Sequence, residues 1–386
     1  MINIVDKEEC CGCHSCYAIC PLHCIDMIYD REGFIYPKIN NNICINCGTC
    51  ERACPVICNP SIGEYTKAFA AWSKNDLNRE NSSSGGVFGE LMKQTIIQNG
   101  IIFGAAFDES MKLCHQSARS ENEGEKFRGS KYLQSIIGNV YSDVKLCLTE
   151  GQKVLFSGTP CQIAGLYSYL GKDDENLLTC DLVCHGVPSQ KVFFAYKRYL
   201  ENKYKGKIIK INFRYKDSGW KKFFLLILFD NGLEYKKVFF DDPFMKGFLE
   251  NIYLRPSCHD CPFSRIPRVA DISLGDFWGV GDHHPEWDDD KGTSLIIVQT
   301  QKGQNAIDAC HYELTLFETD LSVAVKSNHC ISGSVSPNCF RSSFFFDLEL
   351  LSFDKIIKKY MPSRSLITKS FDQLKRAVVF LISFMR

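Results

Sequence analysis

The feature that most constrains this 386-residue chain is a cysteine motif that occurs twice near its beginning. The stretch "CCGCHSCYAICP" contains the spacing C-x2-C-x2-C-x3-C-P, and "CINCGTCERACP" repeats it. In bacterial two-cluster ferredoxins, three cysteines of each motif bind one [4Fe-4S] cluster and the fourth binds the other. The spacing therefore predicts two such clusters. The expected ligands of the first cluster are Cys10, Cys13, Cys16 and Cys54. The expected ligands of the second cluster are Cys20, Cys44, Cys47 and Cys50.

Structural zinc is the alternative interpretation of so many thiols. Zinc sites need four ligands, usually from two C-x2-C pairs or with added histidines, and the duplicated motif does not have that pattern. Cys24 and Cys58 also follow the repeat, and we expect them to be small buried packing residues rather than ligands. Cys11 is out of register and is interpreted as a non-ligand.

The rest of the composition narrows the class of protein. The formal net charge is 0, which gives no indication of nucleic-acid binding. The first residues, "MINIVDKEE", lack the apolar region of a secretory signal peptide, and no run of eighteen apolar residues predicts a membrane span. We therefore expect a cytoplasmic protein, in which 21 cysteines indicate metal ligation or redox chemistry rather than disulfides.

The pattern of apolar residues predicts a small module followed by a larger mixed domain. Between the two motifs, "IDMIYDREGFIYPKIN" (25–40) predicts a β-hairpin that lies over the clusters. From about residue 65, strands and helices alternate, as in a mixed α/β domain. The expected helices are 85–100 (with Ser84 as N-cap), 141–151, 160–170 and 191–203. The expected strands lie within 101–107, 153–158, 177–186, 207–216, 223–240 (a hairpin turning at 230–232), 270–279 and 294–301.

Two loops have the composition of anion-binding turns. "NSSSGGVF" (81–88) and "FSGTPCQ" (156–162) each place serine or threonine and glycine at a helix start, although such residues also serve as ordinary caps. "GEKFRGSKY" (124–132) has glycine spacing like a P-loop but reverses the required Lys-Ser/Thr order. No G-x-G-x-x-G follows an expected strand, so a Rossmann nicotinamide site is not supported.

A second set of cysteines lies in the larger domain. Four thiols at Cys161, Cys184, Cys258 and Cys261 are enough for a third cluster if the fold brings them together, with Cys180 as a substitute for Cys184. Scattered core cysteines plus a zinc-binding pair are the alternative. The remaining cysteines have no partner at ligand spacing and are expected to be structural. They are Cys114, Cys147, Cys310, Cys330 and Cys339.

Seven motifs in residues 65–302 resemble those of the coenzyme F420 hydrogenase/dehydrogenase beta-subunit family, with an N-terminal two-cluster ferredoxin domain added. They are "SSGGVF" (83–88), "FRGSKYLQS" (127–135), "VLFSGTPCQIAGL" (154–166), "DLVCHGVPS" (181–189), "CHDCPF" (258–263), "ADISLGDFWG" (270–279) and "KGTSLIIVQT" (291–300). The resemblance implies FAD and the third [4Fe-4S] cluster. The fold class it implies is α+β, with a bacterial-type ferredoxin fold followed by a mixed α/β flavin-binding domain.

The resemblance also implies a flavin site. Its expected residues are Ser83, Ser84, Gly85, Gly86, Gly129, Ser130, Lys131 and Tyr132. Lys131 would offer positive charge to a flavin phosphate or to the reduced ring, and an ordinary solvated lysine is the alternative. Asp276 and Trp278 either pack beside the cofactor or end a strand. The catalytic residues are unknown, and His185, next to a predicted ligand, is the histidine to test first.

The expected function is that of a flavin-dependent iron–sulfur oxidoreductase. It would move electrons between reduced deazaflavin coenzyme F420, or a ferredoxin, and an unidentified organic acceptor. A non-catalytic relay or docking subunit of a larger redox complex is the alternative. We expect a ferredoxin-type domain at 1–62, a flavin and iron–sulfur domain at 63–335, and a basic helical tail at 336–386. This tail either packs on the body or makes peripheral contact with a membrane surface.

Overall fold

The N-terminal cysteine module is built as a repeat in the structure, a computed structural model that describes residues 6–60 and 67–362. Helices α1 and α2 each follow a residue with left-handed backbone, His14 (φ 70°) and Gly48 (φ 71°), at equivalent positions of the two motifs. The helices are α1 (Ser15–Ile19), α2 (Thr49–Arg52) and α3 (Pro55–Cys58). The strands are β1 (Ile25–Tyr29) and β2 (Ile35–Ile39).

The hairpin expected between the two motifs is confirmed. Strands β1 and β2 pair antiparallel, with Ile25 opposite Ile39. The carboxylate of Asp30 stabilises the turn by accepting hydrogen bonds from the backbone N–H groups of Glu32 (3.0 Å) and Phe34 (2.9 Å). Gly33 provides the positive φ of 86° that completes the turn.

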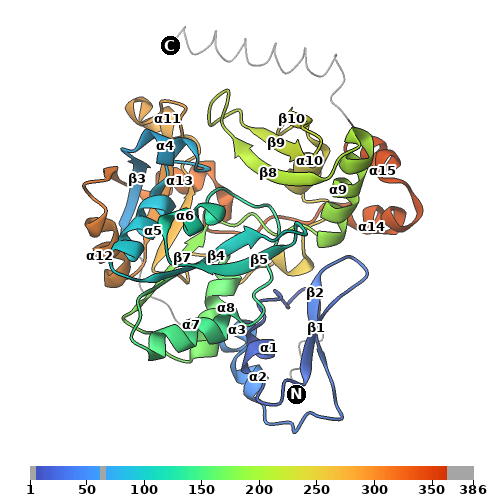
Figure 1. Cartoon of the computed structure of the whole chain (residues 1–386), viewed down its shortest axis with the longest axis horizontal. Coiled ribbons are helices and arrows are strands. Elements are labelled where there is room, and N and C mark those ends of the chain that lie inside the picture. Colours follow the sequence, from blue (N-terminus) through green and yellow to red (C-terminus); the bar gives the residue numbers. More distant parts are fainter. Residues whose placement is uncertain (1–5, 61–66, 363–386) are drawn as a thin grey trace.

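The body of the chain contains an eight-stranded mixed sheet in the order β13-β3-β12-β11-β7-β6-β4-β5 (Figure 1). Strands β4, β6, β7 and β11 run parallel to their neighbours in that group, and the remaining pairs are antiparallel. Ligands of such sheets commonly bind beyond the carboxyl ends of the parallel strands. The strands are β3 (Lys67–Ser73), β4 (Ile101–Phe107), β5 (Leu113–Ala118), β6 (Val154–Gly158), β7 (Leu177–Leu182), β11 (Ile272–Asp276), β12 (Ser294–Val298) and β13 (Leu314–Thr319).

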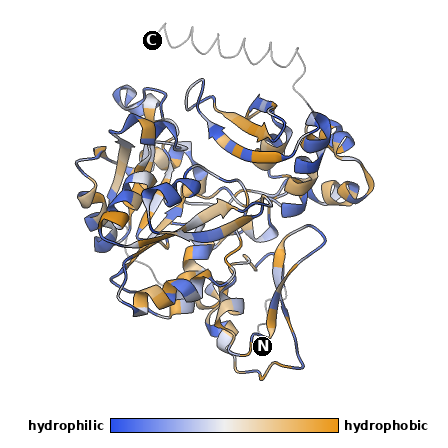
Figure 2. Ribbon diagram, in the orientation of Figure 1, coloured by the Kyte–Doolittle hydropathy of each residue, from blue (hydrophilic) through white to orange (hydrophobic). Residues whose placement is uncertain are grey.

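Helices cover both faces of this sheet. Alternate residues of β4 and β6 enter two different apolar clusters, because successive side chains of a strand point to opposite faces. One cluster includes α5 (Val87–Ile97) and α12 (Gln301–Ala309), and the other includes α7 (Val140–Thr149) and α8 (Pro160–Leu170). Hydrophobic residues, orange in Figure 2, lie on both the strands and the helices. The shorter helices are α4 (Asp76–Glu80), α6 (Glu121–Gly124), α11 (Val280–His283) and α13 (Leu321–Ser327), with 3-10 turns at Glu125–Phe127, Pro256–Cys258, Pro285–Trp287 and His329–Ile331.

A second, three-stranded antiparallel sheet in the order β10-β9-β8 forms an aromatic-rich core with four helices. Phe344 and Ile356, from the region expected to be a separate tail, are wholly buried in this core. The described part of that region therefore packs on the body. The elements are β8 (Ile208–Tyr215), β9 (Phe224–Phe229), β10 (Glu234–Val238), α9 (Gln190–Tyr204), α10 (Pro243–Leu249), α14 (Arg341–Leu350) and α15 (Phe353–Tyr360).

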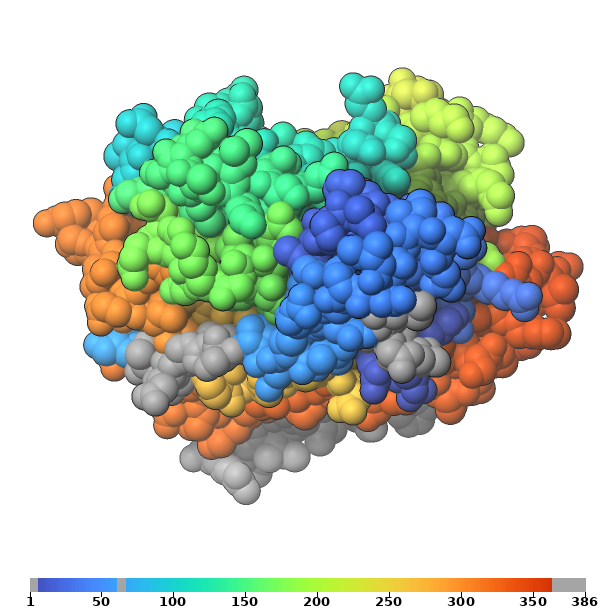
Figure 3. Space-filling view, turned by 90° about the horizontal axis from the view of Figure 1, so that it is seen from below, coloured from blue at the N-terminus to red at the C-terminus, as the bar shows by residue number. Residues whose placement is uncertain are grey.

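The N-terminal module packs on the body through the α7 and α8 side of the large sheet. Cys11 and Cys13 belong to the same apolar cluster as these helices. Figure 3 shows the blue module lying against green segments of the body and beside the red C-terminal helices. Arg341 of α14 donates to both carboxylate oxygens of Glu32 in the hairpin turn, which ties the two regions together.

Most expected elements agree with the structure, which supports a mixed α/β fold. Two predictions were wrong. Ser84 does not cap the helix expected at 85–100, because the helix begins at Val87 after Gly86, whose φ is 90°. The hydroxyl of Ser84 instead donates to the carbonyl of Thr293 (2.9 Å). Cys58 was also expected to be buried, and it is exposed. The hydrophobic segment at 377–385 lies outside the described residues, and among the described helices none is both long and apolar enough to cross a membrane.

Candidate functional site

The four cysteines predicted to hold the first cluster surround one cavity in the N-terminal module. We call this group the inner set. Its members are Cys10, Cys13, Cys16 and Cys54. All four are buried, and burial raises the pKa of the Cys16 and Cys54 thiols. Metal binding requires the thiolate, so these thiols need a cluster to hold them deprotonated at neutral pH.

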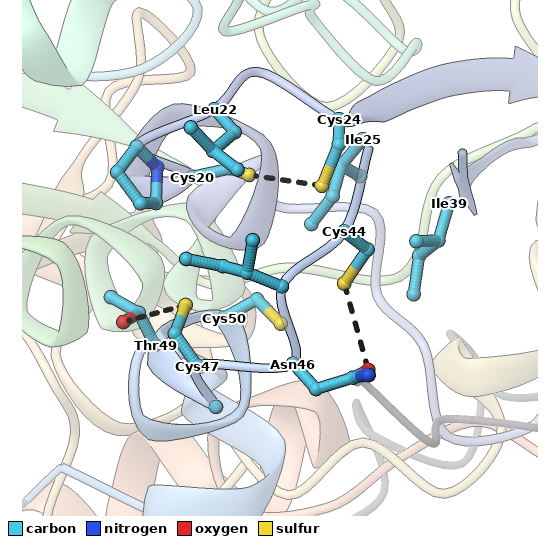
Figure 4. A pocket seen from close by; sticks show the side chains of 13 residues that line it. Cys20, Leu22, Cys24, Ile25, Ile39, Cys44, Asn46, Cys47, Thr49 and Cys50 are labelled. Atoms are coloured by element: carbon cyan, nitrogen blue, oxygen red, sulfur yellow. Dashed lines mark hydrogen bonds between the residues drawn. The ribbon is translucent and has the colours of Figure 1, made fainter. Parts of the chain in front are cut away.

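The cysteines predicted for the second cluster surround a different cavity, which we call the outer set (Figure 4). Its members are Cys20, Cys44, Cys47 and Cys50. Cys47 is exposed and Cys44 is half-buried, so this set faces solvent. Hydrogen bonding from Thr49, through its side chain and its backbone, lowers the pKa of the Cys47 thiol. Each cavity thus takes three cysteines from one motif and one from the other, which is the exchange that the spacing predicts. The ligand roles themselves stay predictions.

The cysteines of the body also come together, in what we call the third set. Its members are Cys161, Cys184, Cys258 and Cys261. Burial raises the pKa of Cys258 to about 12 and that of Cys261 to about 11. The proposed substitute Cys180 does not line this cavity and instead lines the large cavity described below. Within the described residues, no three histidine, cysteine or carboxylate side chains converge on the position of a single metal ion.

Cys11 lies where the inner and third sets meet. It is buried and lines both cavities. Its thiol has side-chain hydrogen bonds with Cys13 of the inner set and Cys161 of the third set. A residue outside the ligand spacing therefore bridges the two cavities.

A much larger cavity of about 310 Å³ opens at the carboxyl ends of β6, β7 and β11. Seven of the eight residues expected at the flavin site line it: Ser83, Ser84, Gly86, Gly129, Ser130, Lys131 and Tyr132. Gly85 lies outside the lining, because its N–H donates to Ser294 and its carbonyl accepts from Ser73, which anchors the loop to the sheet. Thr159, Cys184 and His185 line both this cavity and the cavity of the third set, so the two cavities have a common wall.

The serine loop at 82–86 is held by two cationic side chains, the half-buried Lys216 and the buried Arg214. Lys216 donates to the carbonyls of Ser84 (3.0 Å) and Arg79 (2.6 Å), and burial lowers the pKa of Lys216 to about 8. Arg214 donates to the carbonyl of Ser83 (3.2 Å) and forms a buried ion pair with Asp276 (3.0 Å). These contacts occupy the carbonyls of Ser83 and Ser84.

The loop at 129–132 lies opposite the serine loop. Ser130 donates from both its backbone N–H (2.6 Å) and its hydroxyl (2.9 Å) to the hydroxyl oxygen of Ser83. Lys131 is half-buried in the cavity lining and donates to the carbonyl of Arg128 (2.8 Å). Burial lowers the pKa of Lys131 to about 7, so its amine is near the midpoint of its titration at neutral pH.

His115 and Gln162 form a polar floor of the cavity that sequence reasoning missed. The Nε2 atom of His115 is 2.9 Å from the carbonyl oxygen of Ser157, and its Nδ1 atom is 2.8 Å from the hydroxyl of Ser135. Burial lowers the pKa of His115 to about 4, so the ring is neutral, with Nε2 donating and Nδ1 accepting. Gln162 donates to the carbonyl of Ser135 (2.9 Å). The only sequence signal for Gln162 was its place at the end of "GTPCQ".

Of the other residues singled out in the sequence, some line the large cavity and one does not. His185 lines the common wall, where its Nε2 atom is 2.7 Å from Oδ1 of Asn251 and burial lowers its pKa. Asp276 lines the large cavity, whereas Trp278 is not in its lining and stacks on Trp220 with ring centroids 4.6 Å apart. The loop at 156–162 also contributes to the cavity, with a capping box between Thr159 and Gln162 at the start of α8.

Family models match parts of both the N-terminal module and the body. Residues 151–322 match the family model for the C terminus of the coenzyme F420 hydrogenase/dehydrogenase beta subunit, and residues 37–56 match the 4Fe-4S binding domain. A solved chain of the F420-reducing [NiFe] hydrogenase complex from Methanosarcina barkeri matches with 19% identity and a TM-score of 0.46, covering 70% of this chain and 91% of that chain. No curated protein matches the sequence. The resemblance predicted from the sequence motifs is confirmed by these two family models, over residues 151–322 and 37–56.

Proposed function

Because this chain combines a 4Fe-4S binding domain with the beta-subunit region of coenzyme F420 hydrogenases and dehydrogenases, we propose that it is an iron–sulfur flavoprotein oxidoreductase. It would move electrons between a hydride carrier such as reduced deazaflavin, or a ferredoxin, and an organic acceptor. In the net reaction, the reduced deazaflavin or two reduced ferredoxins lose two electrons, and the acceptor gains two electrons together with its protons.

The observation that carries this proposal is an unbroken series of cavities. The large cavity shares a wall with the cavity of the third set, and Cys11 lines both the cavity of the third set and the cavity of the inner set. The inner and outer sets in turn exchange their fourth cysteines across the N-terminal module. This series leads from an interior cofactor-sized space to the surface at Cys47.

The donor sets fit the cofactors that the family implies. Each cysteine set offers four thiols, which suits an iron–sulfur cluster. No carboxylate lines the cavities of the inner and outer sets, and Glu9 lines that of the third set. The large cavity falls at the lower end of the usual size range for small-molecule sites and combines apolar walls with a few polar groups. When bound, a flavin supplies two-electron exchange with an organic substrate, and [4Fe-4S] clusters supply one-electron transfer.

The residues around the large cavity would bind and orient a flavin. Ser83 and Ser130 present hydroxyls, and Lys131 and Arg128 present positive charge, as a phosphate-bearing ligand requires. A β-carbon at Gly129 would meet no atom within 4 Å, so this position leaves open space on the cavity side. Lys131 holds or releases a proton at Nζ near neutral pH, and hydrogen bonds at both ring nitrogens fix the neutral His115 in the cavity floor.

Anaerobic purification tests the proposal directly. We expect a brown protein with about twelve iron atoms per chain, from three four-iron clusters, and one bound flavin released on denaturation. Serine substitution of Cys161 and Cys258 should remove about four of these iron atoms without removing the clusters of the N-terminal module. A fully iron-loaded chain that neither contains nor takes up FAD would contradict the flavoprotein proposal.

Turnover by the isolated chain separates an enzyme from a relay subunit. We expect reduced deazaflavin to reduce a dye acceptor in the presence of the purified, flavin-loaded chain alone. If turnover requires an added protein subunit although both cofactors are present, the chain is a relay or docking subunit instead.

A further inference from the structure

Arg255 is a completely buried arginine at the junction of the N-terminal module and the body. It is 1% exposed. Its Nε atom donates to the carbonyl of Cys10 (2.9 Å), and its Nη2 atom donates to the carbonyl of Ile35 (2.7 Å). Its Nη1 atom donates to Oε1 of Gln134 (3.1 Å). All three partners of this guanidinium are neutral oxygens.

Other deeply buried arginines of the body have a carboxylate partner. Arg268 pairs with Asp181 (3.4 Å), Arg214 pairs with Asp276 (3.0 Å) and Arg79 pairs with Asp289 (2.7 Å). In the described part of the chain, no carboxylate forms an ion pair with Arg255, and Glu9, which lines the same cavity as Arg255, is exposed to solvent. An unbalanced buried charge is destabilising, and arginine cannot escape this cost by losing its proton. A negative charge from another source is therefore expected nearby.

The position of Arg255 identifies that source. Its guanidinium lies against Gly12 in the loop of the inner set, because a β-carbon at Gly12 would be 2.8 Å from Nη2. Arg255 also lines the cavity of the third set, together with Cys161 and Cys258. The charge thus lies between two cages of thiols, and it also lies over the ring of Tyr36, 4.4 Å from its centroid.

We propose that Arg255 is the fixed counter-charge shared by the inner and third iron–sulfur clusters, and that it raises the reduction potentials of both. This inference rests on the proposed function, because it requires that both clusters are present. A [4Fe-4S] cluster with four thiolates is anionic and gains one further negative charge on reduction. A cation close by in a poorly solvated interior stabilises the reduced state more than the oxidised state.

The outer set provides an internal reference. Arg255 does not line its cavity, and the exposed Cys47 places this cluster next to solvent, which screens distant charges. Removal of the arginine charge should therefore change two potentials and leave the third nearly unchanged. A purely structural role of Arg255 does not predict this selectivity.

The experiment is a redox titration of the anaerobic holoprotein, followed by electron paramagnetic resonance, on Arg255→Gln and Arg255→Lys. We expect R255Q to lower the equilibrium constant for reduction of two clusters by tenfold or more, which for a one-electron couple is about 59 mV. R255K keeps the charge and should restore most of the shift. Arg79→Gln, which removes a buried arginine that has its own carboxylate, is the matched control and should leave all three potentials unchanged.

A second variant covers the case in which R255Q does not assemble its clusters. Gln134→Glu keeps Arg255 and places a carboxylate next to its Nη1 atom, so it should lower the same two potentials. Unchanged potentials in an iron-loaded R255Q would overturn the inference, and so would unchanged potentials in Q134E if R255Q lacks clusters. A wild-type protein without iron would instead contradict the proposed function.

Discussion

The inner and outer cysteine sets come from motifs with the same spacing, but they differ in solvent exposure and in the residues that surround them. Both use the C-x2-C-x2-C-x3-C-P spacing, and both place a left-handed residue before the first helix. The inner set is buried against α8 of the body, whereas the outer set is bordered by exposed apolar residues, including Ile45 at 65% exposure. The motif therefore determines how the four cysteines are grouped, and the position of the group in the molecule determines whether it faces the body or solvent.

This comparison indicates a division of roles. Cys11 lines the cavities of both the inner and the third set. Under the proposed function, a cluster in the inner set would therefore exchange electrons with a cluster in the third set. The outer set faces solvent and is suited to exchange with an external carrier. The following predictions test this division.

The largest expected effect is loss of an inner ligand. Cys10→Ala should remove about four iron atoms and also loosen the module from the body, because the inner cage lies at that junction. Cys47→Ala should remove a similar amount of iron while the module stays docked. Iron analysis together with limited proteolysis between the module and the body measures both effects. Equal protease sensitivity of the two variants would contradict the division.

A change at the docking surface should affect the inner cage alone. A β-carbon at Gly165 of α8 would lie 3.0 Å from Cβ of Cys13 and 2.9 Å from the hydroxyl of Tyr141. Gly165→Leu should therefore destabilise the protein by about 1–3 kcal/mol through overpacking and reduce occupancy of the inner cluster. Thermal unfolding and iron content measure this change. Gly124→Ala, where the added carbon makes ordinary contacts, is the control.

The third prediction concerns the large cavity, where Lys131 should make the rate of dye reduction depend on pH. Burial lowers the pKa of Lys131 to about 7, so its ammonium form predominates below pH 7 and is lost above it. If the ammonium form assists the reaction, the rate of dye reduction should fall about tenfold per pH unit above this pKa. Lys131→Arg, which stays charged, should abolish this fall. The same pH profile in both proteins would assign the titration to another group.

The smallest expected effects concern the cysteines that follow each motif. Cys24 is buried, with its sulfur 3.4 Å from that of Cys20, whereas Cys58 is exposed. Cys24→Ala should lower the Tm by about 2 °C, and Cys58→Ala should change it by less than about 1 °C. Calorimetry of the iron-loaded proteins measures both. A larger effect of C58A would show that exposure does not distinguish the two positions.

Local patterns in the sequence were enough to predict several elements and groupings. The eight cysteines of the module fall around two cavities as their spacing predicts, because a ligand loop is a property of neighbouring residues. The hairpin at 25–40 and helix Pro160–Leu170 were also predicted, since turn residues and a proline in the first helical turn are local signals. Strands β3, β5 and β13 were not predicted, and two of them, β5 and β13, are the edges of the large sheet.

What the sequence by itself determined is the set of reactive groups: two cysteine motifs, a further group of thiols, and a serine- and glycine-rich loop at 81–88. Only the tertiary structure decided how these parts connect. It placed Cys11 between two cages, Arg255 against both of them, and His115 under the large cavity. The reason is that each of these contacts joins residues far apart in the chain, and their meeting depends on how the sheet and the module pack rather than on any local pattern.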